Sequence, residues 1–188
     1  MTAAVRALLA AGASSRRSSA GLPAQPVLGG GSEGALEAPF DLFSDYVYDY
    51  RDHGGTAWAA EALGLDERAV IKTLVMEDDR RAPLVMLMHG DREVSTRALA
   101  RAMGVGSVRP CAPDVAERHS GYKVGGTSPF GLRKALPIYM EATIAGLPRV
   151  FVNGGKRGYL VGIDPADLVR LLQPTAVDAA QAARASTQ

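Results

Sequence analysis

The sequence is poor in the residues that hold several classes of protein together. Its 188 residues contain a single cysteine, Cys111, so no disulfide can form within the chain, and a reducing cytoplasm is the expected compartment. The three histidines, His53, His89 and His119, stand far from one another and from Cys111, without the spacing of a zinc site. We therefore expect neither a structural metal nor a cofactor.

Long apolar runs and an excess of one charge are also missing. No uncharged apolar run approaches the roughly 18 residues of a membrane-spanning helix. The apolar start, residues 1–12, is short and lacks the basic beginning of a secretory signal. An apolar fraction of 47% and a charged fraction of 22% are typical of an ordinary globular domain. These features predict one domain that does not associate with a membrane.

The net charge of +1 hides an uneven distribution. Residues 41–100 hold twelve acidic and seven basic side chains, whereas residues 120–160 hold six basic side chains and one acidic side chain. The basic residues of the second stretch coincide with glycine-rich turns. This pattern favours a local site for an anionic partner over an evenly solvated surface.

The first part of the chain divides into a helix, an insertion and a folded region. Residues 1–12 predict a short helix that ends at glycine. Residues 13–42 are rich in Ser, Gly, Ala and Pro and show no hydrophobic period, which predicts a flexible insertion. The alternation of residues 43–50 predicts a strand, and a helix with Thr56 as its N-cap should follow and end at Gly64.

The remaining pattern predicts an α+β fold, with a mixed, mostly antiparallel twisted sheet and flanking helices. The folded domain should extend over residues 43–172 and be followed by a C-terminal tail, 173–188, that frays. The expected elements are a β-hairpin (70–76 with 84–88), a helix capped by Ser95 (96–103), a short strand (105–109), a helical turn (113–119), an irregular segment (121–137), three strands (138–142, 149–153, 159–163) and a last helix (164–172).

Lys72 is unusual for its position in an apolar strand. Alternation places it on the same face as Val70 and Leu74. A lysine on such a face either extends its stem to solvent at the edge of the sheet or lines a pocket, because an unpaired buried ammonium is costly. The strand alone does not decide between these two interpretations.

Two glycine-rich segments are candidate anion sites. In residues 121–131 (GYKVGGTSPFG) backbone N–H groups could form a nest for a ligand, with hydroxyls from Thr127 and Ser128, or the segment could be a purely structural loop. Residues 154–158 (GGKRG) predict a tight turn, whose Lys156 and Arg157 could also clamp a phosphate or a ribose.

Taken together, the run Ile71-Lys72-Thr73-Leu74 and these two glycine-rich segments resemble the YbaK/EbsC family in order and spacing. That family is related to the editing domain inserted in bacterial prolyl-tRNA synthetase. The resemblance covers about residues 45–172, and residues 1–12 would supply the first helix of the family. It implies that the protein removes wrong amino acids from tRNA in trans, most specifically from Cys-tRNA(Pro).

The resemblance also implies roles for particular residues. Lys72 matches the essential, catalytic lysine of the family, and Tyr50 falls where the family often has a tyrosine. An acidic residue that often follows the GKRG turn in the family is absent from residues 159–163. The matching substrate-binding positions are Gly125, Gly126, Thr127, Ser128, Pro129, Gly131, Gly154, Gly155, Lys156 and Arg157.

The implied partners are the acceptor end of aminoacyl-tRNA and prolyl-tRNA synthetase. In the YbaK type the thiol of the substrate is thought to attack the ester, which would make the activity that of a hydrolase or of a lyase. Two alternatives stay open from the sequence. One is deacylation of another small aminoacyl-tRNA such as Ala-tRNA(Pro), and the other is a nucleotide- or oligonucleotide-binding module without turnover.

Overall fold

The computed structural model describes residues 1–12 and 43–183. The insertion expected at residues 13–42 lies outside the described residues. The helices are α1 (Ala3–Gly12), α2 (Gly55–Leu63), α3 (Thr96–Met103), α4 (Pro113–Ser120) and α5 (Pro165–Leu172), with 3₁₀ turns η1 (Glu67–Ala69) and η2 (Ala142–Gly146). The strands are β1 (Phe43–Val47), β2 (Val70–Asp78), β3 (Pro83–His89), β4 (Arg92–Val94), β5 (Val108–Pro110), β6 (Ile138–Glu141), β7 (Val150–Asn153), β8 (Tyr159–Ile163), β9 (Thr175–Val177) and β10 (Ala180–Ala182). None of the described helices is long and apolar enough to cross a bilayer.

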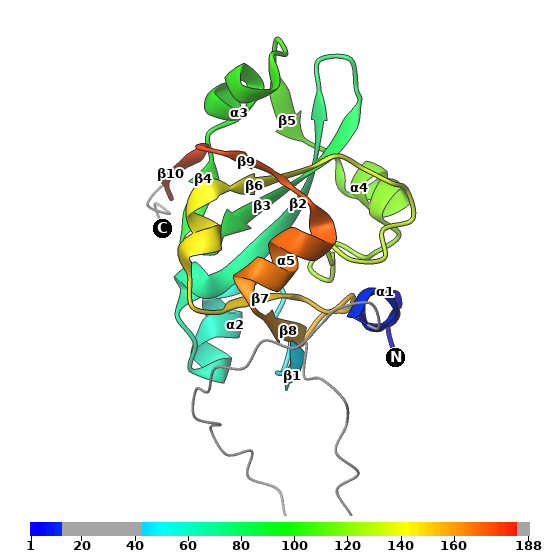
Figure 1. Ribbon diagram of the computed structural model, residues 1–188, viewed down its shortest axis with the longest axis vertical. Coiled ribbons are helices and arrows are strands. Elements are labelled where there is room, and N and C mark those ends of the chain that lie inside the picture. The colour runs from blue at the N-terminus through cyan, green and yellow to red at the C-terminus, as the bar shows by residue number, and fades with distance from the viewer. Residues whose placement is uncertain (13–42, 184–188) are drawn as a thin grey trace, which may run out of the picture.

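One large sheet organises the fold (Figure 1). Its strands lie in the order β1-β8-β7-β2-β3-β6-β9, and β5 also pairs with β2. The pairs β2–β7, β3–β6 and β6–β9 are parallel, whereas β1–β8, β7–β8, β2–β3 and β2–β5 are antiparallel. A separate antiparallel pair joins β4 to β10. The expected fold class, a mixed and mostly antiparallel sheet with flanking helices, is confirmed.

Local sequence signals explain most of the element ends. The Asp78 carboxylate accepts the N–H groups of Arg80 and Ala82 and closes the β2–β3 turn. The Ser95 hydroxyl accepts the Ala98 N–H at the start of α3, as expected. The expectation for Thr56 is wrong, because the N-cap of α2 is Gly54. The Thr56 hydroxyl instead donates to the Glu67 carboxylate (2.8 Å) and the Gly90 carbonyl, so tertiary contacts take precedence over the cap.

Both faces of the sheet are covered, and alternation along β2 assigns each residue to one face. The first face carries Ile71 of β2 with Val85 and Leu87 of β3, packed in one core with α1, α5, Tyr122 and Phe130. The second face carries two cores. One packs Val70 under α2, and the other packs Met76, Met86 and Met88 with Leu99 of α3. On the second face, Lys72 lies between Val70 of one core and Leu74 beside the other, and it belongs to neither core.

The chain does not fray after α5. β9 extends the large sheet through its pairing with β6, and β10 pairs with β4. The Glu141 carboxylate, 2% exposed, accepts the N–H of Ala179 at 2.8 Å. The expectation that the tail frays is wrong over residues 175–182, since a buried carboxylate and strand pairing hold a segment whose Ala- and Gln-rich composition gave no periodic signal.

Candidate functional site

A pocket opens where the edge of β2 is interrupted. β3 pairs with one edge of β2 over residues 71–77. On the other edge, β7 pairs only with Val70 and Ile71, and β5 pairs only with residues 76–78. Residues 72–75 thus have no strand beside them on that edge, and all four line the pocket. The gap spans about 13 Å at the usual rise of a strand.

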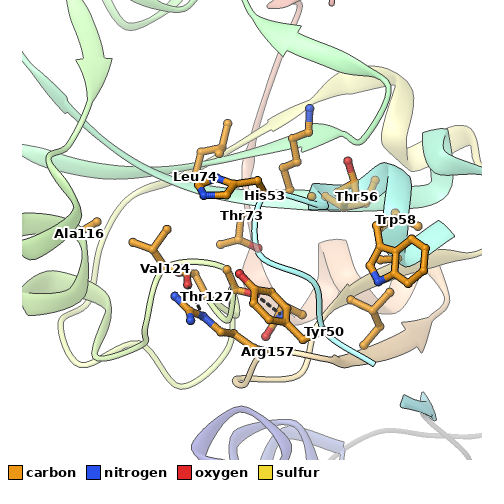
Figure 2. A pocket seen from close by; sticks show the side chains of 18 of the residues that line it. Tyr50, His53, Thr56, Trp58, Thr73, Leu74, Ala116, Val124, Thr127 and Arg157 are labelled. Carbon is orange, nitrogen blue, oxygen red and sulfur yellow. Dashed lines mark hydrogen bonds between the residues drawn. The ribbon is translucent and has the colours of Figure 1, made fainter. Parts of the chain in front are cut away.

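The pocket has a volume of about 580 Å³, within the usual range of small-molecule sites. One wall is the segment before and at the start of α2, and the opposite wall comes from the end of β5, α4 and the glycine-rich loop (Figure 2). Besides residues 70–75, its lining consists of Tyr48, Tyr50, Arg51, Asp52, His53, Gly55, Thr56, Trp58, Ala59, Pro110, Cys111, Pro113, Ala116, Val124, Gly125, Thr127, Asn153, Arg157 and Leu160.

Tyr50 and Arg157 form a clamp across the mouth. The Arg157 guanidinium lies 5.0 Å from the centre of the Tyr50 ring, and its Nε donates to the Val124 carbonyl at 3.0 Å. Asp52 lies 3.8 Å from the same guanidinium. Figure 2 shows the tyrosine and arginine side chains facing each other beside Thr127. This arrangement joins the segment before α2, the glycine-rich loop and the GGKRG turn.

Side-chain hydrogen bonds position the glycine-rich loop from two directions. Asn153 donates to the Gly125 carbonyl at 3.3 Å and accepts the Gly155 N–H, so it ties the loop to the GGKRG turn. Glu117 of α4 accepts the Val124 N–H and the Lys123 ammonium, and these hydrogen bonds lower the pKa of its carboxyl group. Gly125 has φ +84°, and a Cβ there would lie 2.9 Å from the Tyr50 hydroxyl oxygen. Only a glycine fits this position without strain.

Lys72 lines the pocket with its ammonium held at a fixed place. Its Nζ donates to the Arg92 carbonyl of β4 at 2.9 Å. Tyr122 and Phe130 of the glycine-rich segment pack in the core of the first face of the sheet, whereas Lys72 belongs to the second face. Figure 2 shows Thr73 pointing towards Thr127 and Arg157, with Leu74 on the other side of the strand. The lysine and the loop meet only around the open edge.

The sequence-predicted site residues therefore fall into two groups. Lys72, Tyr50, Gly125, Thr127 and Arg157 line the pocket. The other seven do not: Gly126, Ser128, Pro129, Gly131, Gly154, Gly155 and Lys156.

The second group supports the loops instead. Ser128 is fully buried, and its hydroxyl accepts the Phe130 N–H. The Gly126 N–H donates to the Lys123 carbonyl, which removes it from the donors available to a ligand. Gly131 and Gly155 approach α1 closely, since a Cβ on either would lie about 3 Å from atoms of that helix. The Lys156 ammonium lies over the Tyr159 ring.

Sequence reasoning missed several pocket residues. Trp58 and Arg51 form a second cation–π pair with 5.1 Å between the guanidinium carbon and the ring centre, and both line the pocket. Cys111 also lines it, and burial, followed by the nearby Glu77 carboxylate, raises the pKa of its thiol. A thiol with a raised pKa is a weak nucleophile at neutral pH. Trp58 was detectable as the chain's lone tryptophan, but nothing local marked Cys111 or Asn153.

Among residues 1–12 and 43–183, no three His, Cys, Asp or Glu side chains gather in a way that could hold a metal. The pocket offers three cations (Lys72, Arg51 and Arg157), aromatic rings and the stretch of the β2 edge that pairs with neither β5 nor β7. Such a site can bind and orient an anionic or polar ligand.

Comparison with known proteins identifies the family. Residues 55–171 match the family described as the aminoacyl-tRNA editing domain. The chain belongs to this family. The resemblance predicted from the three motifs is thereby confirmed, and the matched range contains most of the pocket.

Individual relatives agree with this assignment. EbsC of Enterococcus faecalis, a candidate Cys-tRNA(Pro)/Cys-tRNA(Cys) deacylase, is 29% identical over 130 residues, which are 69% of this chain and 79% of EbsC. The proline–tRNA ligase of Ligilactobacillus salivarius is 31% identical over 100 residues, 53% of this chain but only 17% of the ligase. The name of EbsC supports deacylation within the family, and neither name supports the lyase activity expected from the sequence as one alternative.

A solved structure supports the fold. The crystal structure of a candidate trans-editing enzyme for prolyl-tRNA synthetase superposes with a TM-score of 0.67 at 22% identity, over 74% of this chain and 87% of that one. The mixed sheet and its helices therefore have the same arrangement as in that structure.

Proposed function

We propose that this protein is a trans-editing deacylase that removes cysteine from Cys-tRNA(Pro). The observation that carries the proposal is the convergence of three family motifs on one pocket: Lys72, the loop at Gly125–Thr127 and Arg157 all reach it. The name of the relative EbsC supports the choice of aminoacyl group. A tRNA substrate would place the protein in the cytoplasm.

The pocket residues take separate roles in this proposal. The Lys72 ammonium binds the terminal adenosine or the adjoining phosphate, as a compact cation suits a single oxygen. Tyr50 and Arg157 present a flat, positively charged surface at the mouth. The main-chain N–H groups of Gly125 and Thr127 are the loop donors for the aminoacyl carbonyl, since that of Gly126 is already bonded. Such donors act by stabilising the charge that develops on the carbonyl oxygen.

An aminoacyl ester is already activated, so the protein need not supply a nucleophile. For a cysteinyl ester, the thiol sulfur of the substrate attacks the ester carbonyl carbon. A C–S bond forms, the bond from that carbon to the ribose oxygen breaks, and the thiol proton passes to the ribose oxygen. Water then opens the cyclic thioester to free cysteine. The raised pKa of Cys111 fits this division of labour, because the protein's own thiol stays protonated.

The proposed partners are the acceptor end of tRNA and prolyl-tRNA synthetase. A net charge of +1 is low for a protein that binds tRNA unaided, since phosphate contacts dominate such affinity. A synthetase that holds tRNA(Pro) would supply the missing affinity and the choice of tRNA. Co-migration of the protein with the synthetase and tRNA(Pro) on a sizing column tests this, and elution of the protein alone would count against it.

The activity is tested by incubating the protein with Cys-tRNA(Pro), Ala-tRNA(Pro) and Ser-tRNA and following the ester. Loss of the cysteinyl ester alone supports the proposal, and selective loss of the alanyl ester supports a deacylase for another small amino acid. Salt-dependent tRNA binding with no ester loss would refute the enzyme and favour a binding module. A chain with Lys134→Ala serves as a folded control that loses an exposed cation outside the pocket.

A further inference from the structure

The interrupted edge of β2 offers main-chain hydrogen-bonding groups to a ligand. In a strand, the N–H and C=O of one residue point to the same edge, and alternate residues point to opposite edges. The Cys111 N–H donates to the Val75 carbonyl at 3.0 Å, which fixes Val75 as a residue that points towards β5. Two residues earlier, Thr73 must point the same way, into the gap between β7 and β5.

The gap therefore has a defined chemistry. Thr73 presents one donor and one acceptor, and neither β5 nor β7 reaches it. Buried main-chain groups in proteins almost always have a hydrogen-bond partner. The N–H and C=O of Thr73, at the wall of the pocket, are therefore available to a ligand. In an antiparallel ladder, two residues that face each other exchange two hydrogen bonds. A single amino-acid residue can complete this exchange opposite Thr73.

We propose that the gap binds the aminoacyl group of the substrate as a one-residue edge strand. This inference rests on the proposed function and names how its substrate is recognised. The α-ammonium donates to the Thr73 carbonyl, and the ester carbonyl accepts the Thr73 N–H. The second lone pair of that carbonyl stays free for a loop donor at Gly125 or Thr127. The strand amide and the loop amide together would stabilise the oxyanion.

The geometry also places the side chain of the amino acid. Residues that face each other across a ladder point to the same face of the sheet. The ligand side chain would share the first face with Thr73, where Figure 2 shows Thr127 and Arg157. Lys72, on the second face, stays on the other side of the ligand. The glycine-rich loop thus selects the amino acid, and the lysine does not.

The inference has a sharp consequence for the α-amino group. An N-acylated residue lacks the charge that the Thr73 carbonyl accepts, and its added group would run towards β5 or β7, which bound the gap. Peptidyl and N-acetylaminoacyl esters should therefore be rejected. If the pocket recognised only the end of the tRNA, it would instead accept esters with a free α-amino group and esters with an acylated α-amino group equally.

The test uses non-hydrolysable amides of cysteine with 3′-amino-3′-deoxyadenosine, one with a free α-amine and one N-acetylated. We expect acetylation to weaken binding at least tenfold by calorimetry. NMR should show that the free-amine ligand slows exchange of the Thr73 amide hydrogen at least tenfold and leaves Leu74, already bonded to β3, unchanged. Equal binding of the two amides, or bound ligand without protection of Thr73, would overturn the inference.

Matched variants separate the main chain from the side chain. The Thr73 hydroxyl is buried without a partner among the described residues, so Thr73→Val keeps the main-chain groups and should bind within threefold of wild type. Thr175→Val, at an exposed position of β9, is the control for the substitution itself. A tenfold loss in Thr73→Val alone would assign recognition to the hydroxyl and contradict the main-chain proposal. Because these assays measure binding, they remain decisive even if no ester is cleaved, the result that would refute the proposed function.

Discussion

Removing the Lys72 ammonium is the most informative single perturbation of the pocket. Lys72 is half-buried between Val70 of one apolar core and Leu74 beside the other, and its ammonium donates one hydrogen bond to the Arg92 carbonyl. A charge-assisted hydrogen bond from a fixed group to a substrate oxygen contributes about 1.5–3 kcal/mol. Donors in a closed site reach about 4 kcal/mol. At about 1.4 kcal/mol for each factor of ten, Lys72→Ala should lower kcat/KM by roughly 10- to 1000-fold.

The structure also gives Lys72 a contact that a purely structural residue would have. The loss of its bond to Arg92 and of its packed stem should cost about 1–2 kcal/mol of stability, a fall in Tm of roughly 2–8 °C. Lys72→Met keeps the stem and should recover most of that stability, while deacylation stays as low as in Lys72→Ala. Lys72→Arg should not restore full activity, because a planar guanidinium replaces a compact ammonium poorly in a tight site.

Two measurements on the same samples distinguish a substrate-binding role of Lys72 from a purely structural one: the rate of ester loss from Cys-tRNA(Pro) and the thermal melting curve. Lys134→Ala removes an exposed cation that does not line the pocket, so this variant should keep both the deacylation rate and the Tm of the wild type. If Lys72→Met folds and deacylates at the wild-type rate, the lysine only supports β4, and its proposed role in binding the tRNA end is wrong.

Three further predictions concern the loop, the tail and the cysteine. Gly125→Ala places a Cβ at φ +84° and 2.9 Å from the Tyr50 hydroxyl, so deacylation should fall at least tenfold, whereas Gly146→Ala, with open space around it, should stay near wild type in the same assay. Deleting residues 174–188 leaves the buried Glu141 carboxylate without its N–H donor and removes β9, so Tm should fall by roughly 5–10 °C, and an unchanged melting curve would contradict the packing described. The pKa of Cys111 is raised, so a smaller fraction of its thiol is ionised at neutral pH than in a cysteine peptide. The rate of alkylation by iodoacetamide should therefore reach half its maximum at a higher pH than for the peptide, and a half-maximal pH equal to or lower than that of the peptide would contradict this.

The elements of this fold were predictable where one residue carries a local signal. Ser95 and Gly104 bracket α3 as their cap propensities require, and alternating apolar residues mark β2 and β3. Thr56 shows the limit of such reasoning. Its hydroxyl could cap a helix or bond to Glu67, and only the approach of a residue eleven positions later decides which. Composition likewise gave no indication of β9, because its pairing depends on β6 and on the Glu141 carboxylate.

The candidate site was predictable to a similar depth. Motif order singled out Lys72, Gly125 and Arg157, which line the pocket, together with Ser128 and Gly131, which hold the loop in place. A glycine-rich motif does not distinguish these two duties, since both need close approach of the backbone. Their separation depends on which glycines face α1 and which face the pocket, and that is a property of the tertiary structure.

The location of the pocket follows from topology and not from any single motif. β7 approaches β2 in parallel at its beginning, and β5 approaches antiparallel at its end. Two strands that pair with opposite ends of one edge leave the middle open, and the size of the opening is fixed by their registers. The motif around Lys72 lies in this opening. The Lys72 side chain lies on the second face, the Thr73 side chain lies on the first face, and neither β5 nor β7 pairs with the Thr73 main chain. The position of Lys72 inside an apolar strand is possible here because the pairing of β2 is interrupted along one edge only, and β3 pairs with β2 along the other edge.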